Sequence, residues 1–240
     1  MKKLSLLTAF MAMTAAAVAA VPAPVIDLKC NAGDLTALQD ISANKCQVKV
    51  QHPDKFFWAD GPAGRTLVFK DNASPRGNRG TVVITPPATF DTAKGFTLIV
   101  NFKTPKDYNY KRRYQLVHFA QGADKLTGFS LFIYWRSVMF RYGENSRVGI
   151  ASKAASHPMR PDTWYEVAVT FDGKKTVLYL NGEAVATGDN AVIPMPPRRR
   201  TPIAIGSTSA GGAGYGFDGM ISKFQLYDRA LTADEIADME

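Results

Sequence analysis

The stretch from Trp164 to Val185 constrains the fold of this chain more than any other part of the sequence. From Glu166 to Phe171, apolar residues alternate with small or polar ones, which is the pattern of a strand with one buried face. Asp172-Gly173 follows, then a second alternating run from Thr176 to Leu180, then Asn181-Gly182. Both dipeptides supply the positive φ values that tight hairpin turns require. The stretch therefore predicts consecutive antiparallel strands.

The N-terminus carries the marks of an export signal. Met1 to Lys3 is basic, and Leu4 to Ala20 is apolar and rich in alanine. Val18 to Ala20 offers the small residues that a signal peptidase reads, with a cut one residue earlier as the alternative. We expect a cleavable signal peptide over residues 1–20 and a single domain over residues 21–240. This predicts a secreted, periplasmic or cell-surface protein.

Length, charge and cysteine content limit the possible folds and ligands of the mature chain. A mature chain of about 220 residues fits one all-β domain. The net charge is +8, or +6 without Lys2 and Lys3, which is ordinary for solubility and also suits anionic glycans. In an oxidising compartment we expect a disulfide between Cys30 and Cys46, closing a loop of about 17 residues and contributing about 3 kcal/mol. The cysteine spacing fits no zinc pattern.

Further alternating runs predict a β-sandwich with a short C-terminal helix. Thr232 and Glu235 form a capping box, so the helix is expected from about Ala233 onward. Asp34 to Ile41 is either one helical turn or a loop. The other predicted strands are Val25–Cys30, Cys46–Val50, Thr66–Phe69, Thr81–Thr85, Phe96–Lys103, Tyr114–Phe119, Phe129–Arg136 and Val138–Tyr142.

Several segments, taken in order, resemble one family. Trp164 to Gly182 resembles the pattern W-x-x-V-A-x-T-Y/F-D-G … V-x-L-Y-V-N-G of laminin-G-like domains in the concanavalin A-like lectin/glucanase superfamily. Pro202 to Gly206 is similar to its P-L-x-I-G, and Phe217 to Leu231 to its closing F-D-G-x-I-D-E-V-R-I-Y-N-R-A-L-S. Gly64 to Phe69 looks like the start of the family's G-x-A-L-x-F-D-G segment, but Lys70-Asp71-Asn72 departs from its D-G ending. The resemblance covers residues 25–240 and implies an all-β, antiparallel two-sheet jelly roll.

Catalytic members of this superfamily carry patterns that this chain lacks. Laminarinase-type members hold their carboxylates on one strand as E-x-D-x-x-E, and no predicted strand here contains that spacing. Gln115-Leu116-Val117-His118 looks like the Q-x-H of alginate-lyase-type members, but one residue longer. In a regular strand this places Gln115 and His118 on opposite faces. We expect His118 to be a hydrogen-bonded sandwich residue and the protein to be no enzyme.

Two regions are candidates for glycan binding, because aromatic faces stack on sugars and arginines bind hydroxyls or carboxylates. In the strand Phe129–Arg136 every second residue, from Phe129 to Trp135, is apolar. If these residues face the core, the residues between them point outward. That outward set, continued on the next strand, is Phe132, Tyr134, Arg136, Met139 and Arg141. The second region is a basic loop that contains Tyr108, Tyr110, Arg112 and Arg113. The alternatives are two faces buried under loops, and a solvated charged loop.

The resemblance also implies calcium as a candidate cofactor, and Asp218 and Asp40 are the carboxylates that we expect to hold it. No other cofactor is expected. We expect a secreted, non-catalytic carbohydrate-binding module, with acidic or sulfated glycans as candidate ligands. The alternatives are a cell-envelope protein-adhesion or structural subunit, and a divergent polysaccharide hydrolase or lyase. Neither nucleic acid binding nor a transmembrane segment is expected.

Overall fold

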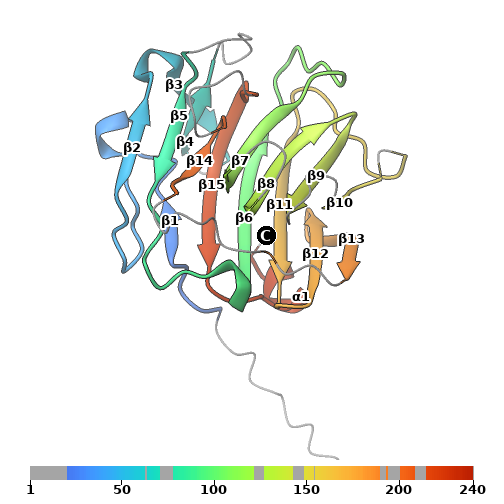
Figure 1. The fold of residues 1–240 in the computed structure, drawn as a ribbon. Helices are drawn as coiled ribbons and strands as arrows, with labels where there is room; N and C mark the ends of the chain where they lie inside the picture. The colour runs from blue at the N-terminus through green and yellow to red at the C-terminus, as the bar shows by residue number, and fades with distance from the viewer. Residues whose placement is uncertain are drawn as a thin grey trace, which may run out of the picture.

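Two antiparallel β-sheets pack face to face in the computed structural model of the chain (Figure 1). The structure describes residues 21–62, 64–70, 78–121, 127–142, 149–153, 155–189, 193, 201–208 and 215–239, and the predicted signal peptide, residues 1–20, lies outside them. No helix in the described ranges is long and apolar enough to cross a membrane. The predicted antiparallel two-sheet sandwich is confirmed.

The first sheet, sheet A, has eight strands. They are β1 (Ile26–Leu28), β3 (Phe56–Gly61), β4 (Gly64–Phe69), β6 (Phe96–Lys103), β11 (Trp164–Phe171), β12 (Lys175–Leu180), β13 (Glu183–Asp189) and β15 (Gly219–Tyr227). Their order across the sheet is β13-β12-β11-β6-β15-β4-β3, and β1 pairs with β15 along the edge that β4 leaves open. The meander predicted from Trp164 to Val185 forms β11, β12 and the start of β13.

The second sheet, sheet B, has seven strands. They are β2 (Val48–Gln51), β5 (Thr81–Ile84), β7 (Tyr114–Gln121), β8 (Thr127–Tyr134), β9 (Ser137–Tyr142), β10 (Gly149–Ala151) and β14 (Ile203–Ile205). Their order is β10-β9-β8-β7-β14-β5-β2. Three consecutive hairpin strands, β7 to β9, form the centre of one half of this sheet and position the candidate site described below.

Helical segments are short. Three are 3₁₀ turns, namely η1 (Leu35–Ala37), η2 (Pro53–Lys55) and η3 (Thr92–Lys94), and η1 resolves the region left open between a turn and a loop. The one α-helix of the described chain is α1 (Ala233–Ala237), and it begins at the predicted capping box of Thr232 and Glu235.

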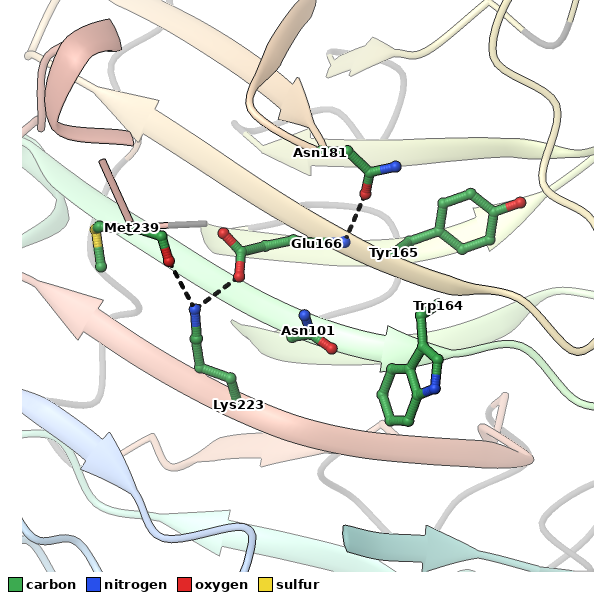
Figure 2. A pocket seen from close by; sticks show the side chains of 7 residues that line it. All are labelled: Asn101, Trp164, Tyr165, Glu166, Asn181, Lys223 and Met239. Carbon is green, nitrogen blue, oxygen red and sulfur yellow. Dashed lines mark hydrogen bonds and ion pairs between the residues drawn. The ribbon is translucent and has the colours of Figure 1, made fainter. Parts of the chain in front are cut away.

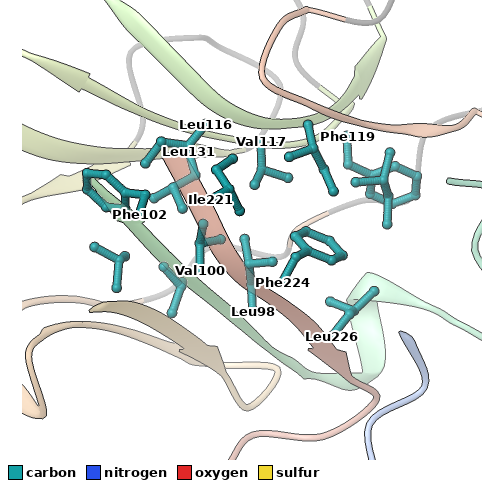
Figure 3. Close-up of a cluster of buried hydrophobic side chains, with 14 of the residues drawn as sticks. Leu98, Val100, Phe102, Leu116, Val117, Phe119, Leu131, Ile221, Phe224 and Leu226 are labelled. Atoms are coloured by element: carbon teal, nitrogen blue, oxygen red, sulfur yellow. The ribbon is translucent and has the colours of Figure 1, made fainter. Parts of the chain in front are cut away.

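The core lies between the sheets and is rich in aromatic side chains (Figure 3). β6 contributes Phe96, Leu98, Val100 and Phe102, each fully buried. Phe96 stacks across the interface on Phe129 of β8, with ring centroids 5.0 Å apart and planes 20° apart. Because side chains of a strand alternate, these contacts decide which residues of β6 and β8 point outward.

The predicted disulfide between Cys30 and Cys46 is absent, and both residues are free thiols. Their flanking strands, β1 and β2, lie in different sheets and not side by side as the prediction assumed. Burial raises the pKa of the Cys30 thiol, and burial together with the neighbouring Asp40 carboxylate raises that of Cys46 to about 12. Both shifts favour the protonated thiol over the thiolate near neutral pH.

Glycine is required at position 206 because of its positive φ and because there is no space for a Cβ. A pair of variants separates these two effects. Gly206 has a φ of 85°, and a Cβ there would overlap the buried ring of Phe69, whereas Gly64 has a φ of 96° with open space around it. Gly64→Ala should therefore cost about 1 kcal/mol from the backbone alone. Gly206→Ala should cost about 2–4 kcal/mol because overpacking adds to that term. Urea unfolding measures both, and equal losses would contradict the packing argument.

Candidate functional site

The turn between β8 and β9 has an unusual sequence for its geometry. Tyr134 pairs with Ser137, and the two residues between them, Trp135 and Arg136, both have positive φ, at 50° and 61°. Such two-residue turns strongly favour Asn-Gly, and this chain uses Asn181-Gly182 at the β12–β13 turn, with φ of 49° and 70°. A tryptophan and an arginine in this conformation cost roughly 1–2 kcal/mol each. Strain of this kind at an exposed turn points to a functional role for the two side chains.

The strained turn and the loop before β7 together present a group of exposed and partly exposed aromatic and basic side chains, which we call the rim cluster: Tyr110, Tyr134, Trp135 and Arg136. Trp135 is 50% exposed, and its ring centroid lies 5.7 Å from those of both Tyr110 and Tyr134. Arg136 lies over the Tyr110 ring at 4.8 Å, and the Trp135 amide donates to the Tyr110 carbonyl at 3.0 Å. The cluster is therefore one connected surface, suited to stacking against a sugar ring.

The rim cluster joins the two regions that the sequence analysis kept apart. Tyr110 comes from the basic loop, while Tyr134 and Arg136 come from the β8–β9 hairpin. Trp135 was missed, because its place in an apolar alternation assigned it to the core. β8 ends at Tyr134, so Trp135 lies in the turn and not between the sheets.

Behind the rim, Phe132 does not present its ring to solvent as the sequence analysis expected. It does lie on the outer face of β8, but it is only 1% exposed. Arg113 lies flat over it, with the guanidinium carbon 3.6 Å from the ring centroid, and Arg141 lies over the same ring at 5.2 Å. A sugar meeting this part of the sheet would therefore contact arginine rather than phenylalanine.

A β-bulge in β7 corrects the expectation for Gln115 and His118. Gln115 pairs with Phe132 and Val117 pairs with Leu131, so Leu116 is an extra residue without a partner. Leu116 and Val117 both belong to the core, as Figure 3 shows. The bulge cancels the additional residue in the spacing, and Gln115 and His118 both point to the outer face, where each approaches Ser130.

The outer face of sheet B therefore holds a second group, which we call the face cluster: Arg113, Gln115, His118, Ser130, Phe132 and Arg141. Nη2 of Arg113 donates to Oε1 of Gln115 at 2.8 Å and to the Ser130 hydroxyl at 3.2 Å. The Gln115 amide nitrogen lies 2.7 Å from the Val117 carbonyl, 3.0 Å from the Leu131 carbonyl and 3.0 Å from the Ser130 hydroxyl. Gln115 is fully buried, so its role is to hold Arg113 and not to touch a ligand.

His118 is held neutral at ordinary pH. Burial, as the larger cause, and the positive charge of Arg113 together lower its pKa to about 4. Its Nδ1 lies 3.5 Å from the Ser130 hydroxyl. The expectation of a hydrogen-bonded sandwich residue agrees with this contact, although the residue faces outward and not toward the core.

The remaining candidate residues have structural contacts. Tyr108 packs on the Tyr114 ring at 5.2 Å, and Arg112 pairs with Asp218 at 3.0 Å. The Asp40 carboxylate accepts four hydrogen bonds, from the amides of Asp27, Ser42 and Cys46 and from the Ser42 hydroxyl, at 2.7–3.0 Å. In the described ranges no three His, Cys, Asp or Glu residues come together to hold a metal ion. The calcium expectation remains untested.

A recess of about 330 Å³ lies on the outer face of sheet A (Figure 2). Its walls include Asn101, Trp164 and Asn181, and its floor holds the ion pair of Lys223 with Glu166 at 2.7 Å. Lys223 also donates to the Met239 carbonyl at 3.4 Å, and the Glu166 amide donates to Asn181 at 2.9 Å. Among the described residues that line this recess, Glu166 is the one carboxylate, and it is paired with Lys223, so the described part of the recess does not supply the two carboxylates that glycosidases use.

Comparisons with known proteins agree with the fold. The model of the Laminin_G_3 family, described as the concanavalin A-like lectin/glucanases superfamily, matches residues 76–237. No curated protein matches the chain. Similar solved structures include the binding domain of botulinum neurotoxin serotype C1, with a TM-score of 0.68 and 13% identity.

Two further similar structures have titles that mention ligands. The binding domain of botulinum neurotoxin DC in complex with SialylT has a TM-score of 0.66 and 14% identity. A structure of botulinum neurotoxin type C, whose title states that cell entry depends on interaction with two ganglioside molecules, has a TM-score of 0.67 and 14% identity. All three cover 90% of this chain, which spans only about half of their length, 50–51%. At this identity the likeness shows the fold alone.

Two double variants of the β8–β9 turn test its strain. One variant combines Trp135→Asn with Arg136→Gly, and the other combines Trp135→Ala with Arg136→Ala. Both remove the same side chains, but Asn-Gly tolerates positive φ better than Ala-Ala. The Asn-Gly variant should be more stable than the Ala-Ala variant by about 2 kcal/mol in urea unfolding. Equal stabilities would show that the turn is not strained.

The lowered pKa of His118 predicts a pH dependence of stability. As the pH falls below the ordinary histidine value of about 6.5, the unfolded chain takes up a proton before the folded protein does, so stability is lost toward pH 4. Between about pH 7 and about pH 5 the wild type should lose up to about 2 kcal/mol more than His118→Gln in urea unfolding. Parallel losses in both proteins would place the histidine pKa near its ordinary value.

Proposed function

This chain belongs to the Laminin_G_3 family of the concanavalin A-like lectin/glucanase superfamily, and we propose that it binds carbohydrate without cleaving it. The rim cluster is the binding surface. The observation that carries the proposal is the β8–β9 turn, where Trp135 and Arg136 adopt a costly conformation and extend into solvent. The backbone geometry of this turn would favour Asn-Gly. We therefore attribute the presence of tryptophan and arginine to the function of their side chains.

The chemistry of the rim cluster supports a sugar ligand. Trp135 and Tyr110 offer aromatic faces, and Arg136 adds hydrogen-bond donors directly beside them. The ligands in the titles of two similar structures, SialylT and gangliosides, support the same class of function by analogy of fold. Fold analogy is the weaker support, because one fold hosts many functions.

A non-catalytic role is supported by what the sheet faces offer. The seven strands of sheet B contain no aspartate or glutamate, so they supply neither acid nor base for glycoside hydrolysis. Although the bulge brings Gln115 and His118 to one face, Gln115 is buried and hydrogen-bonded to carbonyls of the sheet. It is not free to bind a sugar carboxylate as a lyase residue would.

We further propose that the protein acts outside the cytoplasm, as the export signal expected over residues 1–20 indicates. Its net positive charge favours acidic or sulfated glycans among the candidate ligands. Such glycans occur at surfaces and in matrices, where a module that holds a polymer without degrading it would serve adhesion.

A glycan array tests this function. Wild type should be retained on a subset of glycans, and Trp135→Asn with Arg136→Gly should lower the affinity about tenfold or more while the protein stays folded. Trp164→Ala is the matched control, because Trp164 lines the recess on the opposite sheet and should leave binding unchanged. Thermal unfolding of each variant separates lost binding from lost structure.

Three results would overturn the proposal. Loss of binding in Trp164→Ala alone would move the site to the recess on sheet A. Release of reducing ends or unsaturated sugars would assign an enzyme. Absence of any glycan binding, together with capture of a purified envelope protein, would favour the protein-adhesion alternative.

A further inference from the structure

We propose that Arg113 and Arg141 form an anion-binding subsite on the outer face of sheet B, which accepts the sulfate or carboxylate group of an acidic sugar. That the anion belongs to a sugar rests on the proposed function, whereas the anion site itself rests on the contacts of the face cluster. The two statements can fail separately, and the experiment below distinguishes them.

Arg113 is a partly buried cation that makes no ion pair with any described residue. Its Nη2 is used by Gln115 and Ser130, but its Nε is buried and has no hydrogen-bond partner among the described residues. The guanidinium is enclosed between the Phe132 ring at 3.6 Å and the Tyr215 ring at 4.7 Å. A partly desolvated charge without a counter-charge is costly, and a bound anion would offset that cost.

Arg141 brings a second positive charge to the same place. It pairs in register with Ser130 on the neighbouring strand, and it shares the Phe132 ring with Arg113. Two like charges that approach one ring repel each other, so a ligand anion between them is favoured. Arginine suits this task because its planar group binds carboxylate and sulfate oxygens in pairs.

Four cations on the sandwich have acidic partners, in contrast to these two. Across the described residues, Lys103 pairs with Asp162, Arg112 with Asp218, Lys223 with Glu166 and Arg229 with Glu235, whereas neither Arg113 nor Arg141 makes an ion pair. The strands of sheet B contain no acidic residue that could serve them. Since no described carboxylate pairs with either arginine, we assign the counter-charge to a ligand.

The subsite is pre-organised and continuous with the rim cluster. Gln115 and Ser130 fix Arg113 before any ligand arrives, so little ordering is needed on binding. Tyr134 follows Phe132 by two residues on the same face of β8, a spacing of about 7 Å. One acidic glycan can therefore contact the aromatic rim and place its charged group against the two arginines.

His118 serves as a reporter of occupancy. Its charged neighbours are Arg113 and, one strand further, Arg141, while the residue paired with it on β14 is the uncharged Ala204. An anion held by the arginines would oppose their effect and raise the pKa of His118 by about one unit. Its ring protons are visible by NMR, and the readout needs no glycan.

The first arm of the experiment titrates His118 by NMR in sodium sulfate, sodium trifluoroacetate and sodium chloride at matched ionic strength, because both test anions stay ionised at the pH where His118 titrates. Sulfate, trifluoroacetate or both should raise the pKa of His118 in wild type relative to chloride, and the effective ion distinguishes a sulfate from a carboxylate site. Arg141→Gln should abolish the response, while Lys94→Gln, which removes an exposed charge elsewhere, should keep it. Identical titrations in all three salts would overturn the subsite.

The second arm measures affinity for dextran, dextran sulfate and polygalacturonate by calorimetry. Arg141→Gln and Arg113→Gln should weaken binding of the charged polymer about tenfold or more, whereas Lys94→Gln should change it less than about twofold. Arg141→Gln keeps the test valid if Arg113→Gln fails to fold. Glycan binding unaffected by Arg141→Gln would refute the subsite and leave the proposed function intact. A sulfate response of His118 without any glycan binding would support the subsite and refute the proposed function.

Discussion

The packing of Phe96 against Phe129 across the two sheets is the contact on which the rest of the structure depends. Once Phe129 turns inward, alternation along β8 directs Ser130, Phe132 and Tyr134 outward. The same alternation on β9 directs Arg141 outward beside Ser130. The outer face of sheet B is thus decided by the aromatic core behind it, and a shift of one residue would exchange the two faces.

Much of the fold could be predicted from the sequence because its signals are local. Phe96–Lys103 alternates clearly and forms β6 with those bounds, and Thr232 and Glu235 cap α1 as expected. The predicted disulfide is not formed in the structure, and sequence spacing did not reveal that the strands flanking the two cysteines belong to different sheets. β3 was missed, since Phe56 to Gly61 lacks regular alternation of polar and apolar residues.

The candidate site was predictable only in part. Tyr110, Tyr134 and Arg136 were recognised by type, but only the hairpin contact shows that they meet. The bulge that brings Gln115 and His118 to one face had a weak signal in the adjacent apolar pair Leu116-Val117. Apolar letters alone also misplaced Trp135, because they cannot tell the last residue of a strand from the first residue of a turn.

The position of β15 has a consequence for how the chain reaches its folded state. This strand, the last in sequence, lies inside sheet A between β6 and β4, and its second half also holds β1 (Figure 1). Until this strand pairs, β6 and β4 expose unpaired backbone to their surroundings, and a chain in that state is prone to associate with its copies. Sheet A is complete only after β15 has inserted between two strands that lie far from it in the sequence.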